Sequence, residues 1–560
     1  MNRNFEPTIL PYNRVNKNDM GKLSFDSISI KKSLIDSLCS VEDLDYNLLF
    51  LAAVCITLTK YTNNTSIFIH VNNIPLIFNS NNRKETVIDY IKIIEEYLSH
   101  PVSSKNKESY FNFIYNGGED KEDYNISLSL FEESQLYILK LKFDSSRYTH
   151  SYINSFLRSI KKVINQFINK GIDKLKIENI LLRCENKVPE FKLLRNPLVN
   201  ELLEAQSIKT PDKIALRVSG EAYTFKQIND ESNNIANGLL KRGFKKGDSV
   251  SFMLPRNKTL ITSFLGIIKA GCVAIPLDMN YPLERINYIK QNSDSKFIIT
   301  YESIEGGINP DDLINEGDPI FPDVQLKADD PIFILYTSGS TGNPKGVISK
   351  HCGISNLTAT HIKNNYEKLL SITSIAFDIS EEDILISFTS GKELIFANDD
   401  EIEDILLLSR LIEKTKPEFV NLTPSRLLSY LQVPEFANSI KHLKSIGCGG
   451  EKFTGNVYDI IKKYADIDIY NGYGPLETSL TSNSKKITNP DYITNGKPLK
   501  NYITDVRDID GKLLPYGVIG ELYIGGLGVS KGYYKMEDKT KKTFISINDV
   551  PYYKTGDYAV

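Results

Sequence analysis

Tyr336-Thr337-Ser338-Gly339-Ser340-Thr341-Gly342-Asn343-Pro344-Lys345-Gly346-Val347 is the stretch around which the chain is organised. An apolar run, residues 332–335, precedes it and predicts a buried strand, so the loop stands at a strand end, where α/β proteins bind ligands. Glycines let the backbone approach a bulky anion, hydroxyls donate hydrogen bonds and Lys345 adds positive charge. The stretch predicts a polyphosphate-binding loop. It is not a Walker A loop, because Pro344 stands where that pattern requires glycine.

The composition is that of a soluble globular protein with several domains. The chain has 560 residues, of which 41% are hydrophobic and 24% charged, and its net charge is -3. This charge gives no footprint for nucleic acid. The longest apolar stretch, residues 48–58, is shorter than the roughly 20 residues that cross a bilayer. Residues 1–12 contain no apolar signal core, so we expect a cytoplasmic protein with neither nucleic-acid nor membrane partners.

The cysteines and histidines give no metal-binding pattern. The six cysteines lie far apart without a C-x-x-C pair, and the six histidines are isolated. We therefore expect reduced thiols and neither a zinc site nor a disulfide framework.

Residues 1–185 form the first predicted domain. Residues 65–71, 126–131 and 137–143 alternate in the way that strands do. Residues 152–168 repeat apolar side chains at helical spacing, and Gly171 follows as a stop. We expect an α/β unit closed by an amphipathic helix.

A polar stretch with two prolines, residues 186–197, is the predicted linker. The second predicted domain, residues 198–560, alternates helical and strand patterns, as helices packed on parallel sheets do.

Motifs along the second domain resemble, in order, those of the acyl-adenylating superfamily, which includes the adenylation domains of nonribosomal peptide synthetases. The phosphate loop quoted above is one of them. Another is Asn471-Gly472-Tyr473-Gly474-Pro475-Leu476-Glu477. The remaining matches are residues 223–228, 268–278, 281–282, 284–285, 377–380, 520–534 and 553–557.

The resemblance implies a multi-subdomain α/β adenylate-forming fold, of which this chain carries the large N-terminal subdomain with parallel-rich sheets flanked by helices. It also implies a reaction in which a substrate carboxylate attacks the α-phosphate of ATP, giving an acyl-adenylate and pyrophosphate. ATP and Mg²⁺ would be the cofactors, and positioning and charge neutralisation would supply most of the catalysis.

The family's functional residues carry over to matching positions. The predicted catalytic residues are Thr337, Ser338, Thr341, Lys345 and Glu477, with Glu477 also the metal ligand. Tyr473 would lie against the adenine and Asp557 would accept hydrogen bonds from the ribose. The other predicted ATP or AMP contacts are Gly339, Ser340, Gly342, Gly449, Gly450, Glu451, Asn471, Gly472 and Gly474. The predicted substrate contacts are Phe377, Asp378, Ile379, Glu382, Asn421, Ile446, Cys448, Gly472, Leu480 and Thr481.

Two carboxylates suggest the substrate class. Asp378 matches the aspartate that faces the α-ammonium group in amino-acid activators, whereas acyl-CoA ligases, the alternative enzyme class, need no buried anion there. Glu382 beside Asn421 favours a cationic side chain, ornithine first and lysine second. The alternative is that the alignment is off by one residue and that Glu382 or Glu381 is solvated.

One departure from the family pattern is Leu476, which stands where threonine is usual. A hydroxyl near the phosphates would be missing, with an effect on rate that the sequence leaves open.

The first domain resembles the C-terminal half of a peptide-synthetase condensation domain. It lacks the H-H-x-x-x-D-G motif of that family, so we expect a partial, catalytically silent condensation-like domain. An unrelated α/β domain is the alternative.

The chain ends at Val560, before the family's C-terminal lid with its catalytic lysine and before any carrier segment. The expected partners are an amino acid and the downstream lid and carrier domains, with phosphopantetheine only on that carrier. Small accessory activator proteins assist some family members, and the sequence leaves that need open. A non-catalytic scaffold or docking fragment is the alternative from a different functional class.

Overall fold

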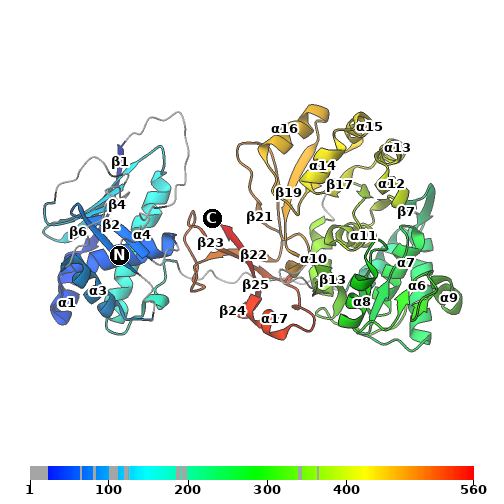
Figure 1. Ribbon diagram of the computed structural model, residues 1–560, viewed down its shortest axis with the longest axis horizontal. Coiled ribbons are helices and arrows are strands. Elements are labelled where there is room, and N and C mark those ends of the chain that lie inside the picture. The colour runs from blue at the N-terminus through cyan, green and yellow to red at the C-terminus, as the bar shows by residue number, and fades with distance from the viewer. Residues whose placement is uncertain are drawn as a thin grey trace. The chain divides into compact units, whose positions relative to one another are not determined.

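The computed structural model describes residues 10, 23–62, 66–79, 84–99, 111–118, 124, 126–183, 191, 198–337, 344–361 and 365–560. By its internal contacts the chain forms two compact units (Figure 1). The first unit comprises Met1–Lys187, Asp505–Tyr523 and Thr555–Val560, and the second comprises Val188–Thr504 and Ile524–Lys554.

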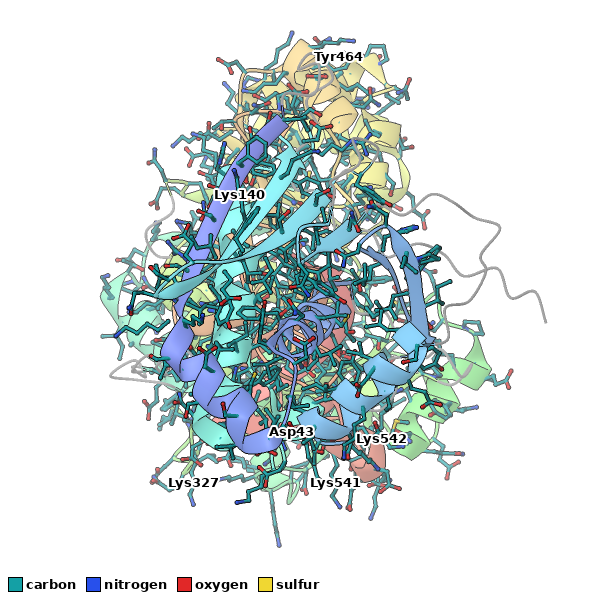
Figure 2. The ribbon with its side chains drawn as sticks, turned by 90° about the vertical axis from the view of Figure 1, so that its left-hand side faces the viewer. Asp43, Lys140, Lys327, Tyr464, Lys541 and Lys542 are labelled. Carbon is teal, nitrogen blue, oxygen red and sulfur yellow. The ribbon has the colours of Figure 1, made fainter. Side chains whose placement is uncertain are left out.

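The first unit contains a six-stranded mixed sheet in the order β1-β6-β5-β4-β2-β3. Along β6, Leu139 and Leu141 are buried while Lys140 is exposed, so one face of the strand packs on the core. Figure 2 labels Lys140, whose Nζ lies 4.9 Å from the centroid of the Phe25 ring. The strands are β1 Leu23–Lys31, β2 Ser66–Val71, β3 Ile74–Asn79, β4 Phe111–Ile114, β5 Ile126–Glu132 and β6 Leu136–Asp144.

The helices of the first unit bury their apolar residues beneath this sheet. Thr149 caps the long α4 by accepting a hydrogen bond from the Tyr152 backbone N–H, and Gly171 follows its last residue. The predicted strands and the predicted closing helix are confirmed. The helices are α1 Lys32–Glu42, α2 Tyr46–Thr62, α3 Val87–Ser99, α4 His150–Lys170 and η1 Ile177–Asn179.

A distant segment of the chain completes the core of the first unit. Leu514 and Val518 belong to its hydrophobic cluster. The buried Lys60 on α2 forms an ion pair with the buried Asp508, with 2.6 Å between Nζ and Oδ2. Burial of such a pair requires both partners, because removing either one leaves an uncompensated charge.

Two sheets form the second unit, and helices pack against them. One is a six-stranded sheet in the order β12-β11-β9-β10-β13-β14, and the other is a nine-stranded sheet in the order β21-β20-β19-β18-β17-β15-β16-β7-β8. Their central strands are parallel because helices supply the crossovers. The predicted α/β fold class is confirmed.

The strands of the two sheets are β7 Ile214–Val218, β8 Glu221–Thr224, β9 Ser249–Phe252, β10 Val273–Pro276, β11 Ile298–Ile299, β12 Gly307–Ile308, β13 Pro331–Thr337, β14 Lys345–Lys350, β15 Lys368–Ser371, β16 Glu393–Phe396, β17 Phe419–Leu422, β18 Ser445–Cys448, β19 Asp468–Tyr473, β20 Asn483–Lys486 and β21 Lys497–Pro498. A fourth sheet has the order β22-β23-β25-β24. Its strands are β22 Tyr502–Arg507, β23 Gly520–Gly526, β24 Phe544–Ile547 and β25 Val550–Ala559.

The remaining helices begin at polar caps in several cases. Thr224 and Gln227 form a capping box at the start of α6. The helices are α5 Val199–Lys209, α6 Phe225–Lys241, α7 Lys258–Lys269, α8 Leu283–Asn292, α9 Pro310–Glu316, α10 His351–His361, α11 Asp378–Ser390, α12 Asp399–Glu403, α13 Ile405–Thr415, α14 Pro424–Tyr430, α15 Pro434–Ser439, η2 Ile440–His442, α16 Gly455–Tyr464, η3 Leu476–Thr478 and α17 Glu537–Thr543.

The predicted phosphate loop connects two antiparallel strands. β13 contains the apolar run predicted as a buried strand and pairs with β14, with Thr337 opposite Lys345. Residues 338–343 lie outside the described residues. This pairing holds the two ends of the loop at one point of the sheet.

In the described part of the chain, no helix is long and apolar enough to cross a membrane. Five cysteines are free and buried there, whereas Cys184 lies outside the described residues.

We predict that Lys269 makes stability depend on pH. The fully buried ammonium group donates hydrogen bonds to Asn229, Ser232 and Asn233, and burial lowers its pKa to about 7. Since the unfolded lysine keeps its usual pKa near 10.5, the unfolded chain binds the extra proton between these values. The free energy of unfolding should therefore rise by up to about 1.4 kcal/mol per pH unit from pH 7 to 10.

Urea unfolding at pH 7, 8 and 9 measures this effect, with Lys269→Met as the control. As the pH rises from 7 to 9, the free energy of unfolding of the wild type should increase relative to that of the variant. If the two free energies changed with pH in parallel, the prediction would be contradicted.

Candidate functional site

The first turns of α11 carry four acidic residues. Phe377 is the N-cap, and Asp378 and Glu382 follow at a spacing of four, which places them on one face of the helix. Glu381 and Asp383 are fully buried. Negative charge is favourable at a helix N-terminus, which partly explains how the fold tolerates this cluster.

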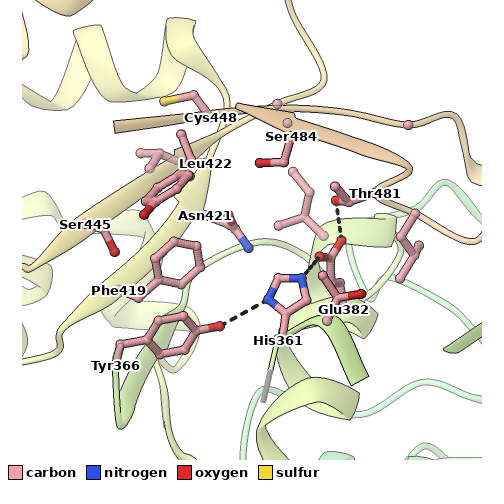
Figure 3. A pocket seen from close by; sticks show the side chains of 18 of the residues that line it. His361, Tyr366, Glu382, Phe419, Asn421, Leu422, Ser445, Cys448, Thr481 and Ser484 are labelled. Atoms are coloured by element: carbon pink, nitrogen blue, oxygen red, sulfur yellow. Dashed lines mark hydrogen bonds and ion pairs between the residues drawn. The ribbon is translucent and has the colours of Figure 1, made fainter. Parts of the chain in front are cut away.

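Asp378 and Glu382 face a cavity of about 410 Å³ in the second unit. Figure 3 shows its walls, which α10, α11, β17, β18, β19 and the segment after η3 supply. Eleven predicted residues line the cavity: Asp378, Ile379, Glu382, Asn421, Cys448, Gly449, Gly450, Gly472, Gly474, Leu480 and Thr481.

Glu382 is held by two neighbours inside this cavity. Its Oε1 lies 3.3 Å from Nε2 of His361, and its Oε2 accepts a hydrogen bond of 2.8 Å from the Thr481 hydroxyl (Figure 3). The Tyr366 hydroxyl lies 3.5 Å from the other His361 ring nitrogen. Glu382 is therefore a buried, oriented carboxylate and not a solvated one, and Glu381 is buried as well.

The pKa of Asp378 is shifted upward. The residue is half-buried, because part of its surface faces the cavity, yet burial raises the pKa of its carboxyl to about 6, and the charge of Glu382 adds to this effect. Ile379 donates its backbone N–H to Oδ1 at 3.0 Å, which acts in the opposite direction. Such a carboxylate is ionised at neutral pH and gains from a cation in the cavity.

Close backbone approach requires glycine at one side of the cavity. A Cβ on Gly474 would lie 1.9 Å from the carbonyl oxygen of Leu480. Ser479 and Leu480 both have left-handed φ values, 53° and 74°. This strained turn directs Leu480 and Thr481 into the cavity.

A second polar cluster joins the end of the phosphate loop to η3. Lys345 Nζ donates to Glu477 Oε1 at 2.8 Å, and the Tyr533 hydroxyl donates to the same oxygen at 2.7 Å. Burial raises the pKa of Glu477, but the ammonium group of Lys345 outweighs this effect and the pKa lies below its ordinary value. Glu477 is thus a buried, ionised carboxylate.

Two predicted substrate contacts do not line this cavity, and their roles remain predictions. Phe377 is 61% exposed, because the N-cap position turns its side chain away from the helix. Ile446 shares a face of β18 with Cys448, and both belong to one buried apolar cluster, but only Cys448 is among the residues that line the cavity.

Two predicted nucleotide contacts have structural partners instead. Glu451 accepts hydrogen bonds from the backbone and hydroxyl of Ser425. Asn471 is buried and donates to the backbone of Thr494. Both side chains lie outside the cavity walls, and their nucleotide roles remain predictions.

The other nucleotide predictions have different outcomes. Ser338, Gly339, Ser340, Thr341 and Gly342 lie outside the described residues. Thr337 ends β13. Tyr473 is half-buried at the end of β19 and Asp557 is exposed on β25, in the first unit. The stacking and ribose roles of these two residues remain predictions.

Sequence reasoning missed three residues. His361 and Tyr366 reach the cavity from outside every recognised motif, so no local signal identifies them. Tyr533 lies inside a recognised motif, residues 520–534, but the motif by itself assigns no role to this side chain.

Comparison with known proteins gives the family. The model of the AMP-binding enzyme family matches residues 203–534. The chain belongs to this AMP-binding enzyme family. A dimodular nonribosomal peptide synthase of Bacillus subtilis is 30% identical over 388 residues, which are 64% of this chain and 16% of that protein. Tyrocidine synthase 3 of Brevibacillus parabrevis is 27% identical over 514 residues, 85% of this chain and 8% of its own length. This AMP-binding chain therefore spans only a small part of each relative.

Solved structures share the fold. The nonribosomal peptide synthetase FmoA3 superposes with a TM-score of 0.84 at 17% identity, covering 98% of this chain and 67% of its own. The N-terminal subdomain of NpsA from Klebsiella oxytoca gives 0.61 at 25% identity, covering 65% of this chain and 96% of its own.

We predict that Leu476→Thr destabilises this AMP-binding enzyme. Leu476 is 5% exposed and belongs to an apolar cluster with Val347, Leu480 and Tyr533, so its side chain fills a core position. A hydroxyl buried there without a partner costs about 1–3 kcal/mol.

The control is Leu476→Val, which has the same shape as threonine without the hydroxyl. Urea unfolding should show a larger loss for the threonine variant than for the valine variant. Equal losses would indicate that the hydroxyl finds a partner.

Proposed function

We propose that this chain is an adenylation unit of a nonribosomal peptide synthetase that activates an amino acid, preferably ornithine and next lysine, as its aminoacyl-AMP. The observation that carries the proposal is the pair of carboxylates, Asp378 and Glu382, that faces one cavity from one side of α11. Two separate anions suit a ligand with two separate ammonium groups.

Asp378 would bind the α-ammonium group. The raised pKa of this half-buried carboxyl reflects the cost of burying its charge. The α-ammonium group of an amino acid would offset that cost. The AMP-binding enzyme family also contains acyl-CoA ligases, whose substrates lack this ammonium group. An apolar acid bound in this cavity would desolvate the Asp378 carboxylate without supplying a cation to pair with it. We therefore favour an amino acid as the substrate.

Glu382 would bind the side-chain ammonium group beside Thr481. An ammonium group has three donors, and the Glu382 carboxylate and the Thr481 hydroxyl oxygen are acceptors within one corner of the cavity. This part of the cavity therefore favours a compact cation that donates several hydrogen bonds.

Lys345 and Glu477 fit ATP and Mg²⁺. Lys345 would bind phosphate oxygens, and the buried, ionised Glu477 would bind Mg²⁺, a cation that prefers oxygen ligands and shares them with phosphates. The bound metal would neutralise phosphate charge. Among the described residues, no group of three or more His, Cys, Asp or Glu side chains could hold a metal ion.

The first unit is proposed to be a partial, silent condensation-like domain on the strength of its mixed α/β architecture and sequence resemblance. Downstream lid and carrier domains, with phosphopantetheine on the carrier, are proposed partners, and the need for an accessory activator stays open.

We predict that the Asp378 charge controls amino-acid use. Its carboxyl ionises above a pKa of about 6, so kcat/KM for the amino acid in pyrophosphate exchange should fall tenfold per pH unit below that value. Asp378→Asn should lower kcat/KM roughly 10- to 100-fold at pH 7.5 and remove this pH dependence. If no amino acid supported pyrophosphate exchange by the wild type, even in a chain extended by the proposed lid domain, the proposed function would be contradicted.

We predict that Glu382 selects the cationic side chain. The Glu382→Gln variant keeps the shape and removes the charge, so it should lower kcat/KM for ornithine at least ~10-fold relative to norvaline, which lacks the side-chain ammonium group. His361→Gln is the matched variant, because it changes the neighbour of Glu382 and leaves the Glu382 carboxylate in place. An ornithine-to-norvaline ratio that is the same in the wild type and Glu382→Gln would refute basic selectivity while leaving amino-acid activation intact.

A further inference from the structure

The segment containing Ser530 to Tyr534 joins the two elements that carry Lys345 and Glu477. The Lys531 backbone N–H donates to Ile348 on β14, and that of Tyr534 donates to Gly346 on the same strand. The Ser530 backbone N–H donates to the Glu477 carbonyl oxygen. One short stretch thus holds both functional side chains in register.

Tyr533 places its hydroxyl between these two side chains. It donates to Glu477 Oε1 at 2.7 Å and accepts from Lys345 Nζ at 3.2 Å, while Lys345 Nζ lies 4.6 Å from the centroid of its ring. The residue is 5% exposed. The hydroxyl therefore contacts both charges without contact with bulk solvent.

Other aromatic residues fix the Tyr533 ring. Phe544 packs edge-on at 5.4 Å between centroids, and the Tyr553 hydroxyl lies 3.3 Å from the Tyr533 hydroxyl. Because the ring is held on several sides, its hydroxyl has little freedom to leave Glu477.

Lys345 and Glu477 neutralise each other in this arrangement, yet the proposed function assigns Lys345 to phosphate and Glu477 to Mg²⁺. When Lys345 turns to the nucleotide, Glu477 loses its ion-pair partner. A buried carboxylate left without any donor is costly and free to rotate. A neutral hydrogen-bond donor that stays in place when Lys345 moves would lower the cost of the buried carboxylate and keep it from rotating.

We propose that Tyr533 is a positioning residue that keeps Glu477 oriented toward Mg²⁺ while Lys345 moves to the phosphates of ATP. The proposal rests on the proposed function, since it needs a nucleotide and a metal at this cluster. Loss of the Tyr533 hydroxyl should weaken the contribution of the metal to nucleotide binding and leave the contribution of the phosphate loop unchanged.

The experiment is calorimetric titration of a non-hydrolysable ATP analogue, with Mg²⁺ and with EDTA, into the full chain. Tyr533→Phe keeps the ring and removes the hydroxyl. We expect about tenfold weaker binding with Mg²⁺ and less than a twofold change in EDTA. The matched control is Tyr534→Phe, which removes a hydroxyl bonded to Asp294, outside the cluster, and should change neither value.

A double-mutant cycle tests whether Tyr533 acts through Glu477. The Mg²⁺-dependent losses of Tyr533→Phe and Glu477→Gln should be far from additive. Additive losses, equal losses with and without metal, or no loss would overturn the positioning role. If the wild type bound no nucleotide in either condition, the proposed function would fail and this inference with it, whereas normal metal-dependent binding by Tyr533→Phe would refute this inference alone.

Discussion

Burial of acidic side chains at the start of α11 is the constraint on which the site depends. Each carboxylate removed from water costs several kcal/mol unless a partner compensates. Asp383 accepts a hydrogen bond from Asn421, and Glu382 is held by His361 and Thr481. Glu381 has no hydrogen-bond partner among the described residues, and burial raises its pKa well above the ordinary value. The helix N-terminus contributes to all of them.

Much of the second unit could be predicted because its signals are local. An apolar run of strand length precedes the phosphate loop, and β13 occupies that place. Spacing of four residues on one helix predicts that Asp378 and Glu382 share a face, and both line the cavity. Such predictions require only the period of a single element.

The failures of prediction have a common physical origin in tertiary packing. His361 ends α10 and meets Glu382 only because two helices pack side by side, which no pattern in either helix specifies. Ile446 has the correct strand period to accompany Cys448, yet only Cys448 lines the cavity, because the packing around Ile446 is apolar on all sides of its side chain. Leu476 reads as a lost hydroxyl in sequence but is a filled core position in the structure. Depth and packing partners are properties of the whole fold.

The two polar clusters of the second unit follow the same design. In one, Glu382 contacts the His361 ring, and in the other Glu477 contacts the ammonium group of Lys345. An internal partner stabilises each buried anion before any ligand arrives, so the fold does not depend on the ligand for its stability. The ligand must then replace that partner, and only a cation of suitable size and donor geometry does so without leaving a buried charge unpaired. Selectivity in such a site arises from the cost of a poor replacement more than from the strength of a good one.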